Sequence, residues 1–144
     1  MKVIKTAEIK INSYIENLGE DSAAGDFEEN ETVTSGYYHY IDGKVMITYS
    51  ESGEGGNIAS EVQLFGSTVR VKRTGAIESS FVFREGEATT SLYRIPPYSF
   101  DTTITTRKIR TNLDENGGTL DLYYAMKIGG AEKNARMKIW ISTN

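Results

Sequence analysis

Apolar and polar residues alternate along most of the chain. Between residues 119 and 128, every second residue is apolar: Leu120, Leu122, Tyr124, Met126 and Ile128. A period of two residues is that of a β-strand with one buried face. Residues 44–51 and 133–142 repeat the pattern, and no window shows a convincing helical repeat of 3.6 residues. The pattern therefore predicts an all-β protein.

Short turn sequences separate the alternating runs. They are Asp42-Gly43, Gly66-Ser67, Glu85-Gly86, Asn116-Gly117-Gly118 and Gly129-Gly130. Their residues tolerate positive φ, so each predicts a tight hairpin. The predicted strands span 2–15, 31–41, 44–51, 57–65, 68–74, 78–84, 87–95, 98–112, 119–128 and 133–142. About eight to ten strands joined by hairpins form an up-and-down meander, and we expect it to close into an antiparallel β-barrel because closure removes exposed strand edges.

Two segments do not follow this pattern of alternating strands and short turns. Residues 16–31 carry seven acidic side chains and no lysine or arginine, which predicts a solvated loop. The pair Pro96-Pro97 removes two backbone donors and predicts a corner between strands. A length of 144 residues is enough for one hydrophobic core, so we expect a single domain over 1–144.

Composition narrows the environment and the partners. The chain has no cysteine, and it begins with an alternating strand pattern instead of an apolar leader, so we expect a cytoplasmic protein. No apolar run reaches the roughly 18 residues of a membrane-spanning helix, and we expect no membrane partner. Residues 1–61 carry 4 basic and 12 acidic side chains, whereas residues 62–144 carry 12 and 8. No aromatic cluster accompanies the basic residues, so we expect no nucleic-acid partner.

Few residue types could support catalysis or metal binding. His39 is the single histidine, and no serine lies in a Gly-x-Ser-x-Gly context. The acidic segment lacks the Asp-x-Asp-x-Asp-Gly register of a calcium loop. We therefore expect no metal, no cofactor and no catalytic residue that the sequence alone identifies.

Strand alternation places two opposite charges on the inner face of the predicted barrel. If Val45 and Ile47 face inward, Glu51 does too, and Val69 and Val71 place Arg73 in the same way. Moving a charge out of water is costly unless it is paired. Glu51 and Arg73 should thus either pair with each other at a barrel mouth or receive a charged ligand.

Several scattered turn and strand residues resemble one bacterial family. They are Gly36-Tyr37-Tyr38, Tyr49-Ser-Glu51, Arg73-Thr-Gly75, Ser91-Leu-Tyr93, Pro97-Tyr98 and Gly118-x-Leu120-x-Leu122-x-Tyr124. In order and spacing they resemble the YwiB-like proteins over nearly the whole chain. That family consists of small lipocalin-like (calycin) barrels of unknown function, so the resemblance implies that fold and carries over no catalytic residue. The matching positions to inspect are Tyr49, Glu51, Arg73, Tyr93 and Tyr98.

Three functions follow as hypotheses. The first is a non-enzymatic barrel that binds a small amphipathic or apolar ligand in its lumen at these five positions. Large side chains, including Tyr37, Phe81 and Phe83, could instead fill that lumen. The second is a protein interaction module that uses the expected outer-surface aromatics Tyr38, Tyr40, Tyr123 and Trp140. The third is a small acid-base enzyme that uses Glu51 and Arg73 with tyrosines. The oligomeric state is left open.

Overall fold

Ten β-strands make up the protein in a computed structural model that describes residues 2–18, 26–53 and 55–144. The strands are β1 (Lys2–Leu18), β2 (Phe27–Ile41), β3 (Lys44–Gly53), β4 (Gly56–Phe65), β5 (Thr68–Gly75), β6 (Glu78–Arg84), β7 (Ala88–Ile95), β8 (Tyr98–Asp114), β9 (Gly117–Ile128) and β10 (Ala131–Thr143). The predicted strands are thus all present, with boundaries that differ by a few residues.

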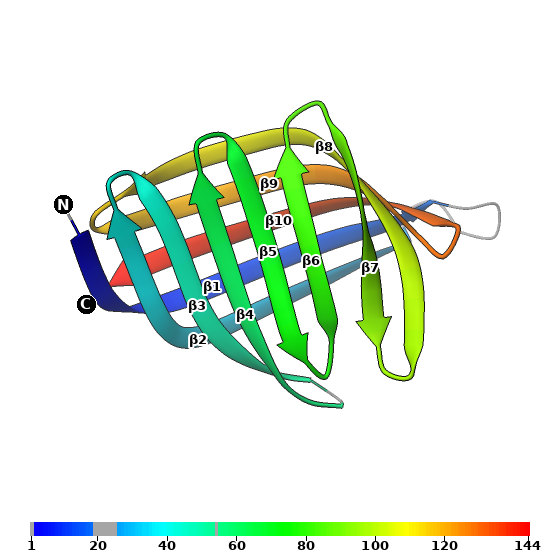
Figure 1. The fold of residues 1–144 in the computed structure, drawn as a ribbon, viewed down its shortest axis with the longest axis horizontal. Helices are drawn as coiled ribbons and strands as arrows, with labels where there is room; N and C mark the ends of the chain where they lie inside the picture. Colours follow the sequence, from blue (N-terminus) through cyan, green and yellow to red (C-terminus); the bar gives the residue numbers. More distant parts are fainter. Residues whose placement is uncertain (1, 19–25, 54) are drawn as a thin grey trace.

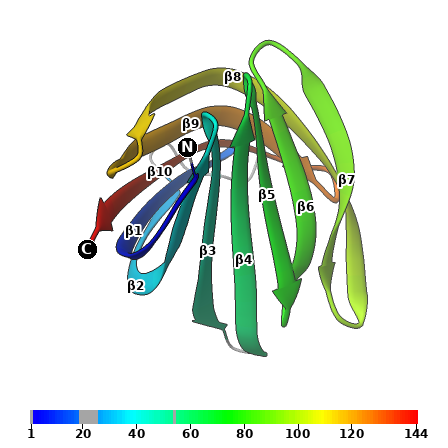
Figure 2. The same ribbon diagram turned by 60° about the vertical axis from the view of Figure 1, so that its left-hand side comes forward.

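The strands form a closed antiparallel barrel. Each strand pairs with its neighbours in sequence, and β1 also pairs with β10, which closes the sheet. This confirms the predicted up-and-down meander. Figure 1 shows β3 to β7 crossing in front of the longer strands β8, β9, β10, β1 and β2, and both chain ends lie at one end of the barrel. Figure 2 shows the same two walls from the side.

The acidic segment is more ordered than the sequence predicts. The expected loop at 16–31 is wrong at both ends, because β1 continues to Leu18 and β2 begins at Phe27. The outer face of this hairpin is supported by Tyr14 stacked on Phe27, with ring centroids 5.2 Å apart. Residues 19–25 of the predicted loop lie outside the described residues.

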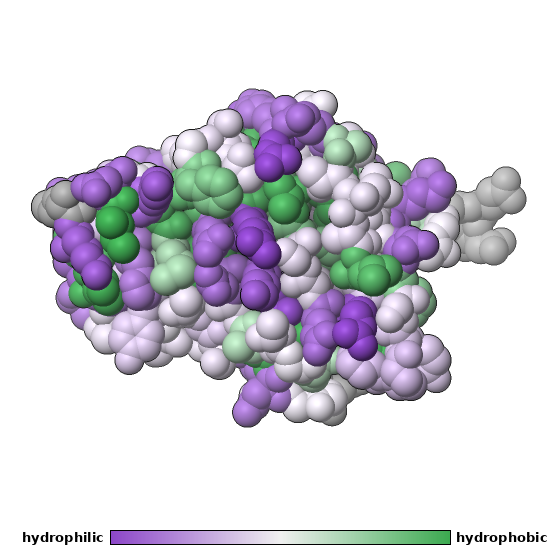
Figure 3. All heavy atoms as spheres, viewed as in Figure 1, coloured by the Kyte–Doolittle hydropathy of each residue, from purple (hydrophilic) through white to green (hydrophobic). Residues whose placement is uncertain are grey.

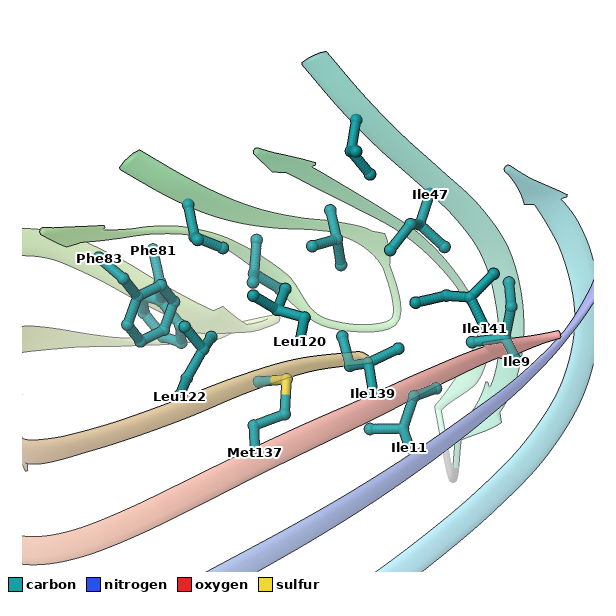
Figure 4. Packing of buried hydrophobic residues seen from close by; sticks show 14 of the residues in the cluster. Ile9, Ile11, Ile47, Phe81, Phe83, Leu120, Leu122, Met137, Ile139 and Ile141 are labelled. Carbon is teal, nitrogen blue, oxygen red and sulfur yellow. The ribbon is translucent and has the colours of Figure 1, made fainter. Parts of the chain in front are cut away.

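The end of the barrel that holds the termini is filled by a hydrophobic core. Ile9, Ile47, Leu122 and Ile139 are fully buried there, and side chains from both walls meet in Figure 4. Phe83 packs edge to face on Tyr124, with ring centroids 4.9 Å apart. The Tyr38 hydroxyl donates a 2.7 Å hydrogen bond to the carbonyl oxygen of Asp114 and so ties β2 to the β8–β9 turn.

The faces of β2 are opposite to those expected. Tyr38 is buried and Tyr37 is 54% exposed, so Tyr38 faces the core and Tyr37 and His39 face outward. The expectation that Tyr38 and Tyr40 are outer-surface aromatics is therefore wrong, because Tyr40 shares the face of Tyr38 and packs against the core, and Tyr37 does not fill the lumen. The reason lies in the register, because Gly36 pairs with the inward-facing Tyr49 and fixes which residues of β2 share its face.

One ladder of the barrel is short. β6 and β7 pair only at Glu78 with Arg94 and at Ser79 with Tyr93. Beyond these pairs, the Thr89 hydroxyl donates a 2.7 Å hydrogen bond to the carbonyl oxygen of Val82. A side chain thus replaces part of the backbone ladder, and we call this junction the β6–β7 seam.

The outer surface carries both polar and apolar side chains, and exposed large hydrophobic residues include Val33, Tyr37 and Leu92. On the face seen in Figure 3, apolar residues form separate patches among polar ones. Within the described part of the chain, no helix is long and apolar enough to cross a membrane.

Candidate ligand site at the mouth of the barrel

A row of polar side chains crosses the inner face of the wall formed by β3 to β7. Successive strand partners place five residues side by side: Tyr49, Ser60, Arg73, Ser79 and Tyr93. We call these five residues the polar row. Tyr49, Ser60 and Ser79 are buried, whereas their sequence neighbours Ser50 and Ala59 are exposed. Strand alternation therefore turns the row toward the lumen.

The rows on either side of the polar row differ in character. Toward the filled end, the next inward row is Ile47, Val62, Val71 and Phe81, all buried. In the other direction lies the rim row, in which Glu51, Ile58 and Gly75 are strand partners; we include in it Ile77, from the β5–β6 turn, and Ile95, at the end of β7. The polar row therefore lies where the apolar core ends and the mouth of the barrel begins.

The polar row contains most of the buried polar atoms that lack a hydrogen-bond partner in the described residues. They are the Tyr49 hydroxyl, Ser60 Oγ, Arg73 Nε and Ser79 Oγ; the others are Thr106 Oγ1 and Asn134 Oδ1. The Tyr49 hydroxyl lies near enough to Ser60 and Arg73 to interact weakly with both, but none of these contacts has the geometry of a full hydrogen bond. Buried polar groups are almost always satisfied in folded proteins, because an unmade hydrogen bond leaves the cost of desolvation uncompensated. Four such atoms on four adjacent strands are typical of a site that receives a polar group.

Arg73 dominates the electrostatics of the site. Burial raises the pKa of the Tyr49 phenol, and the nearby positive charge of Arg73 opposes this rise. Burial likewise raises the pKa of Tyr124, on the opposite wall, and Arg73 again opposes the rise. The guanidinium therefore acts on phenols of both walls, as expected for a cation directed into the lumen.

A pocket of about 510 Å³ lies at the rim row, one row further out than the polar row. It is lined by Gly53, Gly55, Ile58, Gly75, Ala76, Ile77, Ile95 and Pro96. Ile58, Gly75 and Ile95 each stand two residues from a member of the polar row on the same strand, so they share its face, and Ile77 lies in the turn between β5 and β6. The pocket is therefore lined mainly by apolar side chains and backbone, and the polar row lies next to it along the strands.

The structure brings the five sequence-predicted positions into two neighbouring rows. Tyr49, Arg73 and Tyr93 belong to the polar row, and Tyr93 stacks on Phe81 with ring centroids 6.0 Å apart. Glu51 stands in the rim row. Tyr98 pairs with Ile95 at the rim, where it is 66% exposed and follows the cis Pro96–Pro97 peptide bond. Glu51 and Arg73 form no ion pair in the described structure.

Sequence reasoning missed Ser60 and Ser79. Ser60 alternates with Ile58, Val62 and Leu64, so its inward direction could be predicted from the sequence. A single small hydroxyl among apolar residues, however, does not by itself indicate a binding site. Its significance depends on the register that places it between Tyr49 and Arg73. Such a register becomes known only once the strands are paired.

The outer aromatic residues already have partners of their own. The ammonium groups of Lys10 and Lys138 each lie 4.9 Å from the ring centre of Trp140. The guanidinium of Arg136 lies 4.8 Å from the Tyr123 ring and forms an ion pair of 2.8 Å with Asp121. Cations therefore cover part of the surface that a protein partner would need to contact.

The described residues around the mouth include few groups that bind metals or transfer protons. Among the described residues, no group of three or more histidine, cysteine, aspartate or glutamate side chains could hold a metal ion. The polar row itself contains neither a carboxyl group nor an imidazole.

These features define a closed up-and-down β-barrel with one filled end and one polar mouth. Residues 9–141 match the family described as a domain of unknown function (DUF1934), and the chain belongs to that family. It is 27% identical over 127 residues to the uncharacterised beta-barrel protein YwiB of Bacillus subtilis (strain 168), which covers 88% of each chain. The crystal structure of the ywiB protein from Bacillus subtilis superposes with a TM-score of 0.85 at 25% identity, over 98% of this chain and 93% of that one. The family resemblance read from the sequence is confirmed, and these relatives are themselves of unknown function.

Proposed function

We propose that the protein binds a small amphipathic molecule in the mouth of its barrel, without catalysing a reaction. The polar part of the ligand lies on the polar row, and its apolar part lies against Ile58, Ile77 and Ile95. The observation that carries this proposal is the set of four buried polar atoms without a hydrogen-bond partner, one row inward from the rim residues that line an apolar pocket of about 510 Å³. The core beyond the polar row is filled, so the ligand occupies the mouth and not the whole lumen.

Ligand binding at the mouth explains more features of the structure than either of the two alternative functions does. An interaction module would use exposed aromatics, but Trp140 and Tyr123 are covered by cations and Tyr38 is buried. An acid-base enzyme would need a carboxyl group on the polar row, and Glu51 lies one row away at the rim. A ligand that forms hydrogen bonds with the polar row would supply the partners that its buried polar atoms lack.

Native mass spectrometry of the protein, purified gently from its own or a related cytoplasm, tests the proposal. We expect a retained small molecule that is released on unfolding. The variant Ile77→Trp should lose it, because an indole would fill the pocket. Ile41→Trp, on the outer face at the other end of the barrel, is the matched control and should retain it. Protein that carries no small molecule, and that acquires none from a lipid and metabolite extract, would contradict the proposal.

We also infer that the protein works in the cytoplasm. The absence of cysteine fits a reducing compartment, where disulfides do not stabilise folds. Cell fractionation with an antibody against the native protein is the direct test. Recovery in a secreted or membrane fraction would contradict this location.

A further inference from the structure

We propose that the polar group bound by the polar row is a single negative charge, a carboxylate carried by the amphipathic ligand, and that Arg73 is its counterion. This inference rests on the proposed function and adds the chemical class of the ligand. It follows from the absence of a partner for Arg73, from the kind of groups that surround it, and from the number of charges nearby.

Arg73 has no counterion within the described structure. The ion pairs there join Lys10 to Glu31, Arg94 to Glu78 and Arg136 to Asp121, and Arg73 belongs to none of them. Its Nε atom is buried and makes no hydrogen bond. A partly buried guanidinium loses hydration without regaining it from the protein, so an anionic ligand would restore what folding removed.

The groups beside Arg73 complement an acceptor. A guanidinium can only donate hydrogen bonds, and its planar fork fits the two oxygens of a carboxylate. Ser60 and Ser79, the strand partners of Arg73 on either side, each hold a buried hydroxyl without a partner. The Tyr49 hydroxyl completes the set on β3. All four groups are hydrogen-bond donors, whereas an ammonium group would meet the like charge of Arg73.

The charge count favours a monoanion over a dianion. Arg73 is the single cation of the polar row, and Glu51 in the rim row is close enough that its negative charge helps to raise the pKa of Tyr49, after the larger effects of burial and of Arg73. A phosphate dianion would exceed the charge of Arg73 and be repelled by Glu51 about twice as strongly as a monoanion. A carboxylate matches Arg73 one to one.

Three ten-carbon amphiphiles that differ only in the head group test the inference. Decanoate, decanol and decylammonium are titrated into the wild-type protein below their critical micelle concentrations, with binding followed by calorimetry. We expect decanoate to bind about tenfold or more tightly than decanol, because a charge-assisted hydrogen bond is worth at least that ratio. Decylammonium should bind more weakly than decanol.

The variant Arg73→Met removes the charge while keeping an unbranched side chain. It should weaken decanoate binding by about tenfold or more and change decanol binding by less than about threefold. Arg73→Lys keeps the charge but loses the fork, and its affinity for decanoate should fall between the two. Lys72→Met, the exposed neighbour on the outer face, is the matched control and should bind all three compounds as the wild type does.

The outcomes separate this inference from the proposed function. If none of the three compounds binds to the wild type, the mouth is not an amphiphile site and both proposals fall. If decanol or decylammonium binds as tightly as decanoate, or if Arg73→Met leaves decanoate binding unchanged, the mouth remains a ligand site and the carboxylate inference is overturned. The comparison of head groups uses the wild-type protein, so it stands even if Arg73→Met does not fold.

Discussion

Gly36 shows how closely the barrel wall is packed at the level of a single residue. It is the strand partner of Tyr49 and continues the line of the polar row onto β2. A Cβ atom added at Gly36 would lie 2.1 Å from the carbonyl oxygen of Thr48 and 2.7 Å from Ile9 Cδ1. The first of these contacts involves backbone, which cannot move aside without disturbing the β2–β3 pairing.

Gly36→Ala should therefore lower the free energy of unfolding by about 2 kcal/mol or more, as overpacked cores do. Urea denaturation measures this change. Gly55→Ala is the control, because its added Cβ would meet only the Cβ of Ala76 at 3.4 Å, an ordinary contact, and should change stability by less than about 0.5 kcal/mol. Equal stability of the two variants would show that the wall at Gly36 yields more easily than its geometry indicates.

Asp121 carries a pH-dependent contribution to stability. Burial would raise its pKa, but two hydrogen bonds from Arg136, of 2.8 and 3.1 Å, and the charge of that residue lower the pKa overall. The pKa of the Asp121 carboxyl is near 4 in the unfolded chain, and its folded-state pKa lies below that value. The contribution is present above the unfolded pKa and is lost as the pH falls through the folded pKa.

We expect Asp121→Asn to cost about 1 to 2 kcal/mol at pH 7, a value reduced for the exposure of the Arg136 guanidinium. The difference in the free energy of unfolding between Asp121→Asn and the wild type should become smaller below about pH 4, where the wild-type carboxyl also becomes neutral. Urea denaturation at neutral and acidic pH measures both values. Asp101→Asn, at an exposed position, is the control. A cost that stays constant down to pH 2 would argue against this role of the carboxylate.

At the level of whole strands, the sequence predicts the elements better than their faces. Period-two alternation and glycine turns located all ten strands, because both signals are local. The inward face of the segment 33–41 was predicted wrongly. Both faces of this strand carry an aromatic residue, Tyr37 on one and Tyr38 on the other, so alternation alone could not show which face is buried. The pairing of Gly36 with Tyr49 makes that choice, and pairing depends on residues distant in the chain.

For the candidate site, too, the directions of side chains could be predicted from the sequence, but the pairing of residues across strands could not. The inward direction of Glu51 and Arg73 could be predicted from the strands that carry them. Their expected pairing could not be tested without the register, which places Arg73 beside Ser60 and Ser79 and puts Glu51 one row away. The seam between β6 and β7 had no sequence signal, since both strands alternate normally.

The β6–β7 seam should exchange its amide hydrogens readily. The ladder ends after Ser79, and the Val82 carbonyl bonds to a side chain instead of to β7 backbone. We expect the amides of Val82 and Arg84, which point toward β7, to exchange at least about tenfold faster than those of Phe81 and Phe83, which point toward β5.

Hydrogen exchange followed by NMR resolves these alternate amides. Thr89→Val should increase the exchange at Val82 further, because it removes the hydrogen bond across the seam. Thr90→Val, at an exposed position on the same strand, is the control. Uniform protection along β6 would show that the two strands are held together more firmly than their pairing indicates.

The whole molecule changes character along the barrel axis. Inward rows are apolar and filled toward the termini, become polar at Arg73 and end in an apolar rim. The filled part supplies stability and leaves the mouth free to hold groups that would be costly in a core. This division allows one small barrel to carry unpaired polar atoms at its mouth without losing its fold.

The filled part should make the chain unfold as one cooperative unit. Leu122 is fully buried in a core to which both walls of the barrel contribute, so its loss should weaken every strand at once. We expect Leu122→Ala to lower the free energy of unfolding by about 2 to 5 kcal/mol. Trp140 fluorescence, which reports on β10, and far-ultraviolet circular dichroism, which reports on all strands, should give the same midpoint in urea. Leu92→Ala, at a position 52% exposed, should change that midpoint little. Separate transitions for the two probes, or a Leu122→Ala shift in only one of them, would mean that the two walls fold independently and that the residues 1–144 do not form a single domain.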